Sequence, residues 1–272
     1  MNAEVNERRV RRIVVVFGGG SSDMGVAGVL ASLASEGAAD IAAVFLEDQM
    51  LFRLAELPFT TELCRITTTQ RPLTTGELER QMKVQAVRAE RAVRRIAERA
   101  GLSWSFRTKR GRLDAALVGA RDVDLLLLGT QRRSLAPSGE ARAMTWALRT
   151  DEVEALRPVA VLLDQASSGA ELLDAGIRLA KATGRGVILF LSDEAAEAQP
   201  DLARRLEALG PKRSAIQRVS SPDRDPLFAL MRRAAPAVLI VSAGDAGFEE
   251  SNIDALQRQL SCPVVVVRAT SD

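Results

Sequence analysis

The stretch RRIVVVFGGGSSD, residues 11–23, joins an apolar run rich in β-branched residues to three glycines and a cluster of helix-capping residues. A continuous β-branched run is typical of a strand that is buried on both faces of a parallel sheet. The glycines permit a tight turn, and Ser21, Ser22 or Asp23 can cap the helix that follows. The stretch therefore predicts the strand–turn–helix step of an α/β fold.

The same design recurs in the second half of the chain. Residues 11–48 run from this strand through a helix to a second strand, and residues 157–193 repeat that order. A repeated strand–helix–strand pattern predicts two copies of one α/β unit. We expect these copies to occupy residues 1–156 and 157–272.

Strand and helix signals alternate along the rest of the chain. The strongest helix signal begins at Thr74, which has capping-box spacing to Glu77, and ends at Gly101, a natural residue for a helix C-terminus. Further helices are expected near 49–56 and over 198–209. The remaining expected elements are helices at 22–36, 112–120, 225–234 and 250–260, and strands at 41–48, 102–111, 123–130, 158–163, 213–219, 237–242 and 263–267.

The first copy is one strand short of the second. The second copy ends in a helix followed by CPVVVV, residues 262–267, whereas the first ends in a helix followed by RPVAVL, which leads directly into the second copy. Omitting an edge strand is less costly than omitting a central one, so we assign residues 158–163 to the second copy. An exposed sheet edge promotes association. We therefore expect the other half of the chain, or a second chain, to cover it.

The composition of the 272-residue chain excludes several classes of function. A total of 37 Lys and Arg against 35 Asp and Glu, a net charge of +2, predicts no general attraction to nucleic acid. The absence of histidine removes Ser-His-Asp, Cys-His and histidine-ligated zinc chemistry. The two cysteines, Cys64 and Cys262, are too far apart in sequence for a CxxC metal site, and Cys262 is expected in the core.

No metal site and no catalytic residue are therefore predicted. The N-terminus is charged and resembles no signal peptide, and no apolar run reaches the roughly 18 residues that a membrane span requires. A cytoplasmic location without membrane contact is the expectation that follows.

The order of these signals resembles the universal stress protein family. The similar features are the strand–helix–strand start, the long amphipathic helix, DLLLLGT at residues 124–130 and a last helix running into CPVVVV. The arrangement resembles a divergent tandem, two-copy member, and the similarity covers nearly the whole chain apart from residues 49–73. The resemblance implies two Rossmann-like, adenine nucleotide alpha hydrolase-like units, each an open parallel sheet flanked by helices.

The resemblance also implies a role in the stress response, dimerisation through the last strands, and a nucleotide site. ATP-binding members place an aspartate after the first strand and a G-x2-G-x9-G-(S/T) loop after the fourth. In the first copy Gly18 stands where the aspartate belongs, Gly129 keeps the first loop glycine, and Arg132 replaces the second. GGGSSD matches neither G-x-G-x-x-G nor a P-loop. The turn that either caps the helix or binds an anion consists of Gly18, Gly19, Gly20 and Ser21.

The second copy keeps more of this nucleotide motif. Asp164 follows its first strand, but Glu250 replaces the last loop glycine. Carboxylates beside a triphosphate repel it unless Mg²⁺ intervenes. The residues that the resemblance assigns to ATP or AMP are Asp164, Ser242, Gly244, Gly247 and Ser251.

Three functions remain open from the sequence. The first is a non-enzymatic, cytoplasmic universal-stress-like protein that acts through protein contacts and has degenerate nucleotide sites. The second is an ATP- or AMP-binding regulatory switch that uses the second copy. The third is an α/β enzyme that acts on an acidic small molecule at the carboxyl ends of the strands.

Two further interpretations concern the assembly of the protein and the segment at residues 49–73. We expect an internal pseudo-dimer of the two copies, with a homodimer as a further level of assembly. The apolar segment MLFRLAELPF, residues 50–59, is interpreted as a lid packed on the sheet or, alternatively, as a surface that binds a protein partner.

Overall fold

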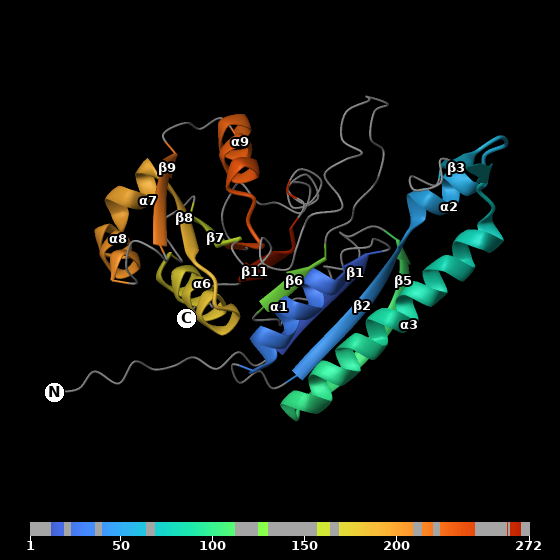
Figure 1. Cartoon of the computed structure of the whole chain (residues 1–272), viewed down its shortest axis with the longest axis horizontal. Coiled ribbons are helices and arrows are strands. Elements are labelled where there is room, and N and C mark those ends of the chain that lie inside the picture. Colours follow the sequence, from blue (N-terminus) through green and yellow to red (C-terminus); the bar gives the residue numbers. More distant parts are fainter. Residues whose placement is uncertain are drawn as a thin grey trace.

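In the computed structural model, the chain forms an α/β fold around one sheet that runs through both halves (Figure 1). None of the helices described is long and apolar enough to cross a membrane. The structure describes residues 12–18, 23–35, 40–63, 69–111, 125–129, 157–163, 169–208, 214–219, 224–242, 260 and 262–267.

The first half of the chain alternates strands and helices, as its hydrophobic runs predict. In chain order its elements are β1 (Arg12–Gly18), α1 (Asp23–Ser35), β2 (Asp40–Asp48), α2 (Gln49–Ala55), β3 (Thr61–Leu63), β4 (Gln70–Pro72), α3 (Thr75–Ala100), β5 (Ser103–Gly111) and β6 (Leu125–Leu128). Four of these strands lie in the large sheet in the order β5-β2-β1-β6, and all pair in parallel. The short strands β3 and β4 form a separate antiparallel hairpin.

The second half repeats this arrangement and adds one strand. Its elements are β7 (Val159–Leu163), α6 (Gly169–Thr183), β8 (Val187–Ser192), α7 (Asp193–Ala198), α8 (Pro200–Glu207), β9 (Ser214–Val219), α9 (Arg224–Ala234), β10 (Val238–Ser242) and β11 (Val264–Val267). The strands lie in the order β9-β8-β7-β10-β11, again all parallel. When the strands are numbered along the chain within this half, their order in the sheet is third, second, first, fourth and fifth. This is the strand order of a Rossmann-like sheet.

The two halves meet where β6 pairs with β11. Among the described residues this is the one antiparallel ladder of the nine-stranded sheet, and it sets Val265 opposite Leu127 and Val266 opposite Leu126. The last strand of the second half therefore covers the edge of β6. Because the ladder is antiparallel, the strands of the two halves run in opposite directions. The carboxyl ends of the strands of one half therefore lie at the same end of the sheet as the amino ends of the strands of the other half.

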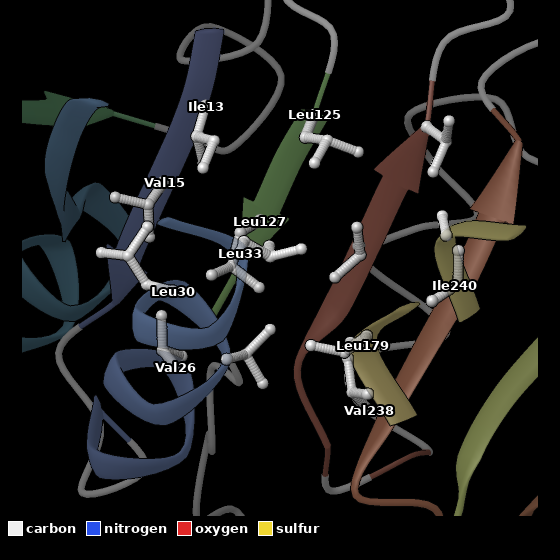
Figure 2. Packing of buried hydrophobic residues seen from close by; sticks show 14 of the residues in the cluster. Ile13, Val15, Val26, Leu30, Leu33, Leu125, Leu127, Leu179, Val238 and Ile240 are labelled. Atoms are coloured by element: carbon white, nitrogen blue, oxygen red, sulfur yellow. The ribbon is translucent and has the colours of Figure 1, made fainter. Parts of the chain in front are cut away.

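One apolar layer continues across this junction. Leu30 of α1 and Leu127 of β6 belong to the same buried cluster as Leu179 of α6 and Ile240 of β10, and none of these four side chains is more than 1% exposed. Figure 2 shows the side chains from both halves within this single cluster. Burial of apolar surface is the main favourable term in folding. We therefore expect the halves to depend on each other for stability.

The helix α3 confirms the predicted capping signals. The Glu77 N–H donates to Thr74 Oγ1 at 3.3 Å at its start. Gly101 ends it with a φ of 66°, in the left-handed region that glycine tolerates best. The face that α3 buries consists of Leu78, Met82, Ala86, Ala89, Val93 and Ala97.

Two expectations about local structure need correction. The helix expected over 198–209 is α8, but it is preceded by α7, which was not expected; the two helices are separated by Gln199, which has the non-helical dihedrals φ −136° and ψ 69°. Pro200 explains the break, because its ring disfavours helical backbone in the residue before it. The excursion at 49–73 contains the expected helix α2, but also the β3–β4 hairpin, whose three-residue strands are too short to show periodicity. The elements expected at 112–120 and over most of 250–260 lie outside the described residues.

Residues 49–63 and 69–73 form a projection at the end of the sheet, next to the first turn of α3 (Figure 1). Phe52 anchors it and is only 4% exposed. The burial of Phe52 agrees with the interpretation of residues 50–59 as a packed lid, whereas the exposure of Leu57 and Phe59 agrees with the alternative of a partner-binding surface. The large apolar side chains that the projection exposes are Met50, Leu57, Phe59 and Leu63.

Candidate functional site

The first candidate site lies at the carboxyl ends of β1 and β6. Gly18 is the last residue of β1, is buried, and pairs in register with Leu46 of β2. The Gly129 N–H donates to the Val16 carbonyl oxygen at 2.8 Å, so this N–H extends the sheet. The other residues assigned to this site, Gly19, Gly20, Ser21 and Arg132, lie outside the described residues.

The packing around Gly129 explains why a glycine stands there. A Cβ at this position would lie 3.1 Å from the Val16 carbonyl oxygen and 3.2 Å from Cγ2 of Val26 in α1. Both distances are tighter than ordinary van der Waals contact. The close approach of β1, β6 and α1 therefore accounts for the glycine without any bound phosphate.

The second candidate site lies at the carboxyl ends of β7 and β10. Because the two halves run antiparallel, this is the end of the sheet opposite to the first site. Ser242 ends β10 opposite Val267 of β11 and is only 1% exposed. The neighbouring strand β7 ends at Leu163, the residue before Asp164. The other residues assigned to this site, Asp164, Gly244, Gly247 and Ser251, lie outside the described residues.

A third site, which was not predicted from the sequence, lies where α3 crosses β2 and β5. A groove of about 400 Å³ opens there between the helix and the edge strand. Its apolar floor combines with two basic and three acidic side chains. The groove is lined by Glu47, Glu79, Lys83, Ala86, Val87, Glu90, Phe106, Thr108 and Arg110.

Arg110 is the centre of the charges in this groove. Its Nε lies 3.0 Å from Oε2 of Glu47 on β2, and its Nη2 lies 3.3 Å from Oε1 of Glu79 on α3. The guanidinium carbon lies 3.7 Å from the centroid of the Phe52 ring. The hydrogen bond to Glu47 is the main cause of a raised pKa of Arg110, so this side chain stays charged. Arg110 thus connects β5, β2, α3 and α2.

The strand alternation of β5 is the signal from which this groove could be found. Trp104, Phe106, Thr108 and Arg110 alternate with residues of the other face, so all four point toward α3. The long helix and the strand that follows it are both evident in the sequence. Glu79 and Glu47, however, are brought to Arg110 only by tertiary packing.

The described residues show no group of three or more His, Cys, Asp or Glu side chains that could hold a metal ion. The groove offers the carboxylates of Glu47 and Glu79, both of which are paired with Arg110, beside apolar side chains. Its arrangement suits binding through charge and apolar contact.

No protein-family model matches this chain, and no curated protein matches it. Among solved structures, a universal stress protein from Archaeoglobus fulgidus is similar at 12% identity and a TM-score of 0.49, over 95% of this chain and 97% of that one. A proposed universal stress protein from Pseudomonas aeruginosa is similar at 11% identity and a TM-score of 0.43, over 95% of this chain and 93% of that one.

A protein of unknown function, also from Pseudomonas aeruginosa, is similar at 10% identity and a TM-score of 0.43, over 95% of this chain and 92% of that one. At TM-scores below 0.5, these likenesses assign neither a family nor a function to the chain. The α/β fold class follows instead from the strand order and the helices that flank the sheet.

Proposed function

We propose that this chain is a non-enzymatic, universal-stress-like protein that acts through protein contacts, and that its nucleotide sites are weakened. In this proposal residues 1–156 and 157–272 are two related units that form an internal pseudo-dimer through β6 and β11. The cytoplasm is the proposed compartment, which agrees with the free, buried thiol of Cys262.

The observation that carries the proposal is the conformation of Phe59. Its side chain is 98% exposed, and its φ is 67°, in the left-handed region. A bulky residue in this region costs about 1–2 kcal/mol relative to an ordinary conformation. The exposed ring recovers none of that cost through packing within the chain. A contact with a second molecule supplies the missing stabilisation.

The surroundings of Phe59 support a docking role. Leu57 and Leu63 on the same projection are each 56% exposed, so several apolar side chains are available together. The hairpin is held in place by the Leu73 N–H, which donates to the Thr60 carbonyl oxygen at 2.9 Å, and by an ion pair between Arg71 and Glu62. A segment that is already held by such contacts loses less conformational entropy when it docks.

The contacts of Gly129 and the burial of Ser242 support weakened nucleotide binding. The Gly129 N–H already donates within the sheet, whereas phosphate cradles need N–H groups that point at the ligand. Ser242 is almost fully buried within β10, so its hydroxyl contributes little surface to a bound ligand.

Site-specific crosslinking tests the docking role. A photoreactive benzoylphenylalanine in place of Phe59 should give a discrete covalent adduct in cells. The same group in place of Arg88, an exposed residue on α3, serves as the matched control. The partner identified in this way should bind the purified wild-type chain but not the Phe59→Ser variant. An adduct pattern identical to that of the Arg88 control would refute the proposal.

A second variant separates docking from folding. Phe59→Gly relieves the strain of a positive φ, so we expect its melting temperature to equal or exceed that of the wild type. The variant should nevertheless lose the partner. A melting temperature several degrees lower would instead mean that the ring stabilises this chain, and would contradict the docking role.

Calorimetry with ATP, AMP and Mg²⁺ tests the nucleotide sites. We expect no binding heat with the wild-type chain or with Asp164→Ala. Micromolar binding that Asp164→Ala abolishes would instead establish the regulatory switch, and turnover of a phosphoester would establish an enzyme.

A further inference from the structure

The outer edge of β5 is an open edge of the nine-stranded sheet. β5 pairs along its full length, Ser103–Gly111, with β2, and no other described strand pairs with it. Open edges are usually short or covered, because their unpaired N–H and C=O groups accept a further strand. A nine-residue open edge is therefore long enough to take an extended segment.

The two faces of this edge differ in charge. On the face away from α3, Arg107 and Lys109 are exposed beside Val44 and Leu46 of β2. None of the described residues forms an ion pair with Arg107 or Lys109. On the α3 face, Arg110 is already paired with Glu47 and Glu79.

The α3 face of the same edge offers apolar surface. Phe106 lines the groove beside β5, and Val87 of α3 lines it from the helix and is 36% exposed. A strand added beyond β5 would place alternate side chains into this groove and the others beside Arg107 and Lys109. The edge thus presents Trp104 and Phe106 on the α3 face and Arg107 and Lys109 on the other face.

A second copy of the chain is a poor occupant of this edge. An antiparallel pairing of two complete β5 strands is centred on Arg107, the middle residue of Ser103–Gly111. It would set Arg107 directly opposite its counterpart, and like charges directly opposite each other destabilise a strand pair. Charge complementarity favours an acidic segment instead.

We propose that the open edge of β5 binds an extended segment of a partner protein by strand addition, and that this segment alternates acidic with apolar residues. Main-chain hydrogen bonds to β5 supply affinity in this mode, and the alternate side chains supply specificity. The acidic side chains pair with Arg107 and Lys109, and the apolar ones enter the groove beside Phe106 and Val87. This interface does not involve Phe59.

Fluorescence anisotropy with a labelled, capped eight-residue peptide of alternating Glu and Val tests the proposal. We expect saturable binding to the full chain, which the double variant Arg107→Glu, Lys109→Glu should weaken by about tenfold or more. The same variant should bind the corresponding Lys–Val peptide better than the wild type does. The matched control, Arg88→Glu with Arg91→Glu, makes the same change in net charge on the exposed face of α3 and should bind as the wild type.

Backbone methylation distinguishes strand addition from simple charge attraction. Only every second N–H of an added strand points at its neighbour. The peptide nitrogens thus fall into two alternating sets, or frames. Methylating the frame whose N–H groups point at β5 should abolish binding, and methylating the other frame should preserve it. Equal loss in both frames, equal loss in both double variants, or no binding up to about 1 mM peptide would each overturn the proposal. Phe59→Ser should bind the peptide normally, so failure here is distinguishable from failure of the docking role.

Discussion

The shared core predicts that damage to one half will unfold the other. Leu179 of α6 is completely buried, and it belongs to the cluster that also contains Leu30 and Leu127 of the first half. We therefore expect Leu179→Ala to lower the stability of the whole chain. If the halves were independent units, the substitution would affect only the second half.

The expected size of this effect follows from the burial of Leu179. Truncating a fully buried leucine to alanine costs about 2–5 kcal/mol, because apolar contact is lost and a cavity is left. In a protein of roughly this size, 1 kcal/mol shifts the melting temperature by about 2–4 °C. A loss of about 3 kcal/mol therefore corresponds to a decrease of about 6–12 °C.

Tryptophan fluorescence reports on the half that is not mutated. The chain has two tryptophans, and in a Trp146→Phe background the remaining one, Trp104, is half-buried on β5 against the core cluster. We expect its thermal transition to shift by the same amount as the transition followed by far-UV circular dichroism. Leu63→Ala on the projection, where the side chain is 56% exposed, should shift both by less than about 2 °C.

A split response would refute this reasoning. If Leu179→Ala produced two transitions by circular dichroism while the Trp104 transition stayed in place, the halves would unfold separately. The β6–β11 ladder would then contribute little to stability.

Three further predictions concern single positions. Gly176→Ala should destabilise the chain by about 1–3 kcal/mol, because its Cβ would lie 2.4 Å from Cγ2 of Val161; Gly28→Ala, with nothing within 4 Å, should stabilise it by about 0.5–1 kcal/mol. Urea midpoints that move both variants in the same direction would contradict this contrast. Thr74→Ala removes the cap of α3 and should cost about 1 kcal/mol, whereas Thr74→Ser should be nearly neutral; equal urea midpoints for the two variants would argue against the cap. Burial raises the pKa of the Cys262 thiol from 9.0 to about 12, so above pH 9 the unfolded chain loses this proton first and stability falls. The loss should reach about 1.4 kcal/mol at pH 10, and Cys262→Ala should remove this part of the difference between urea unfolding at pH 8 and at pH 10. An unchanged pH dependence in that variant would show that the thiol is not the cause.

The local elements of the fold can be predicted from the sequence. The β-branched run at 12–17 becomes β1, and the capping pair Thr74 and Glu77 together with Gly101 sets the ends of α3. These signals are local, since backbone propensity, caps and hydrophobic period act within a few residues. The sequence alone also places strands and helices in alternation, and so determines the α/β class.

Only the tertiary structure decided how these elements are joined and where the binding surfaces lie. No local signal shows that β11 pairs antiparallel with β6, or that Glu47 and Glu79 converge on Arg110 from elements far apart in the chain. Nor does the segment 50–59 reveal that Phe52 is its buried anchor while Phe59 is exposed at a positive φ. Such features depend on contacts between residues distant in sequence, whose geometry exists only once the sheet and its helices have packed.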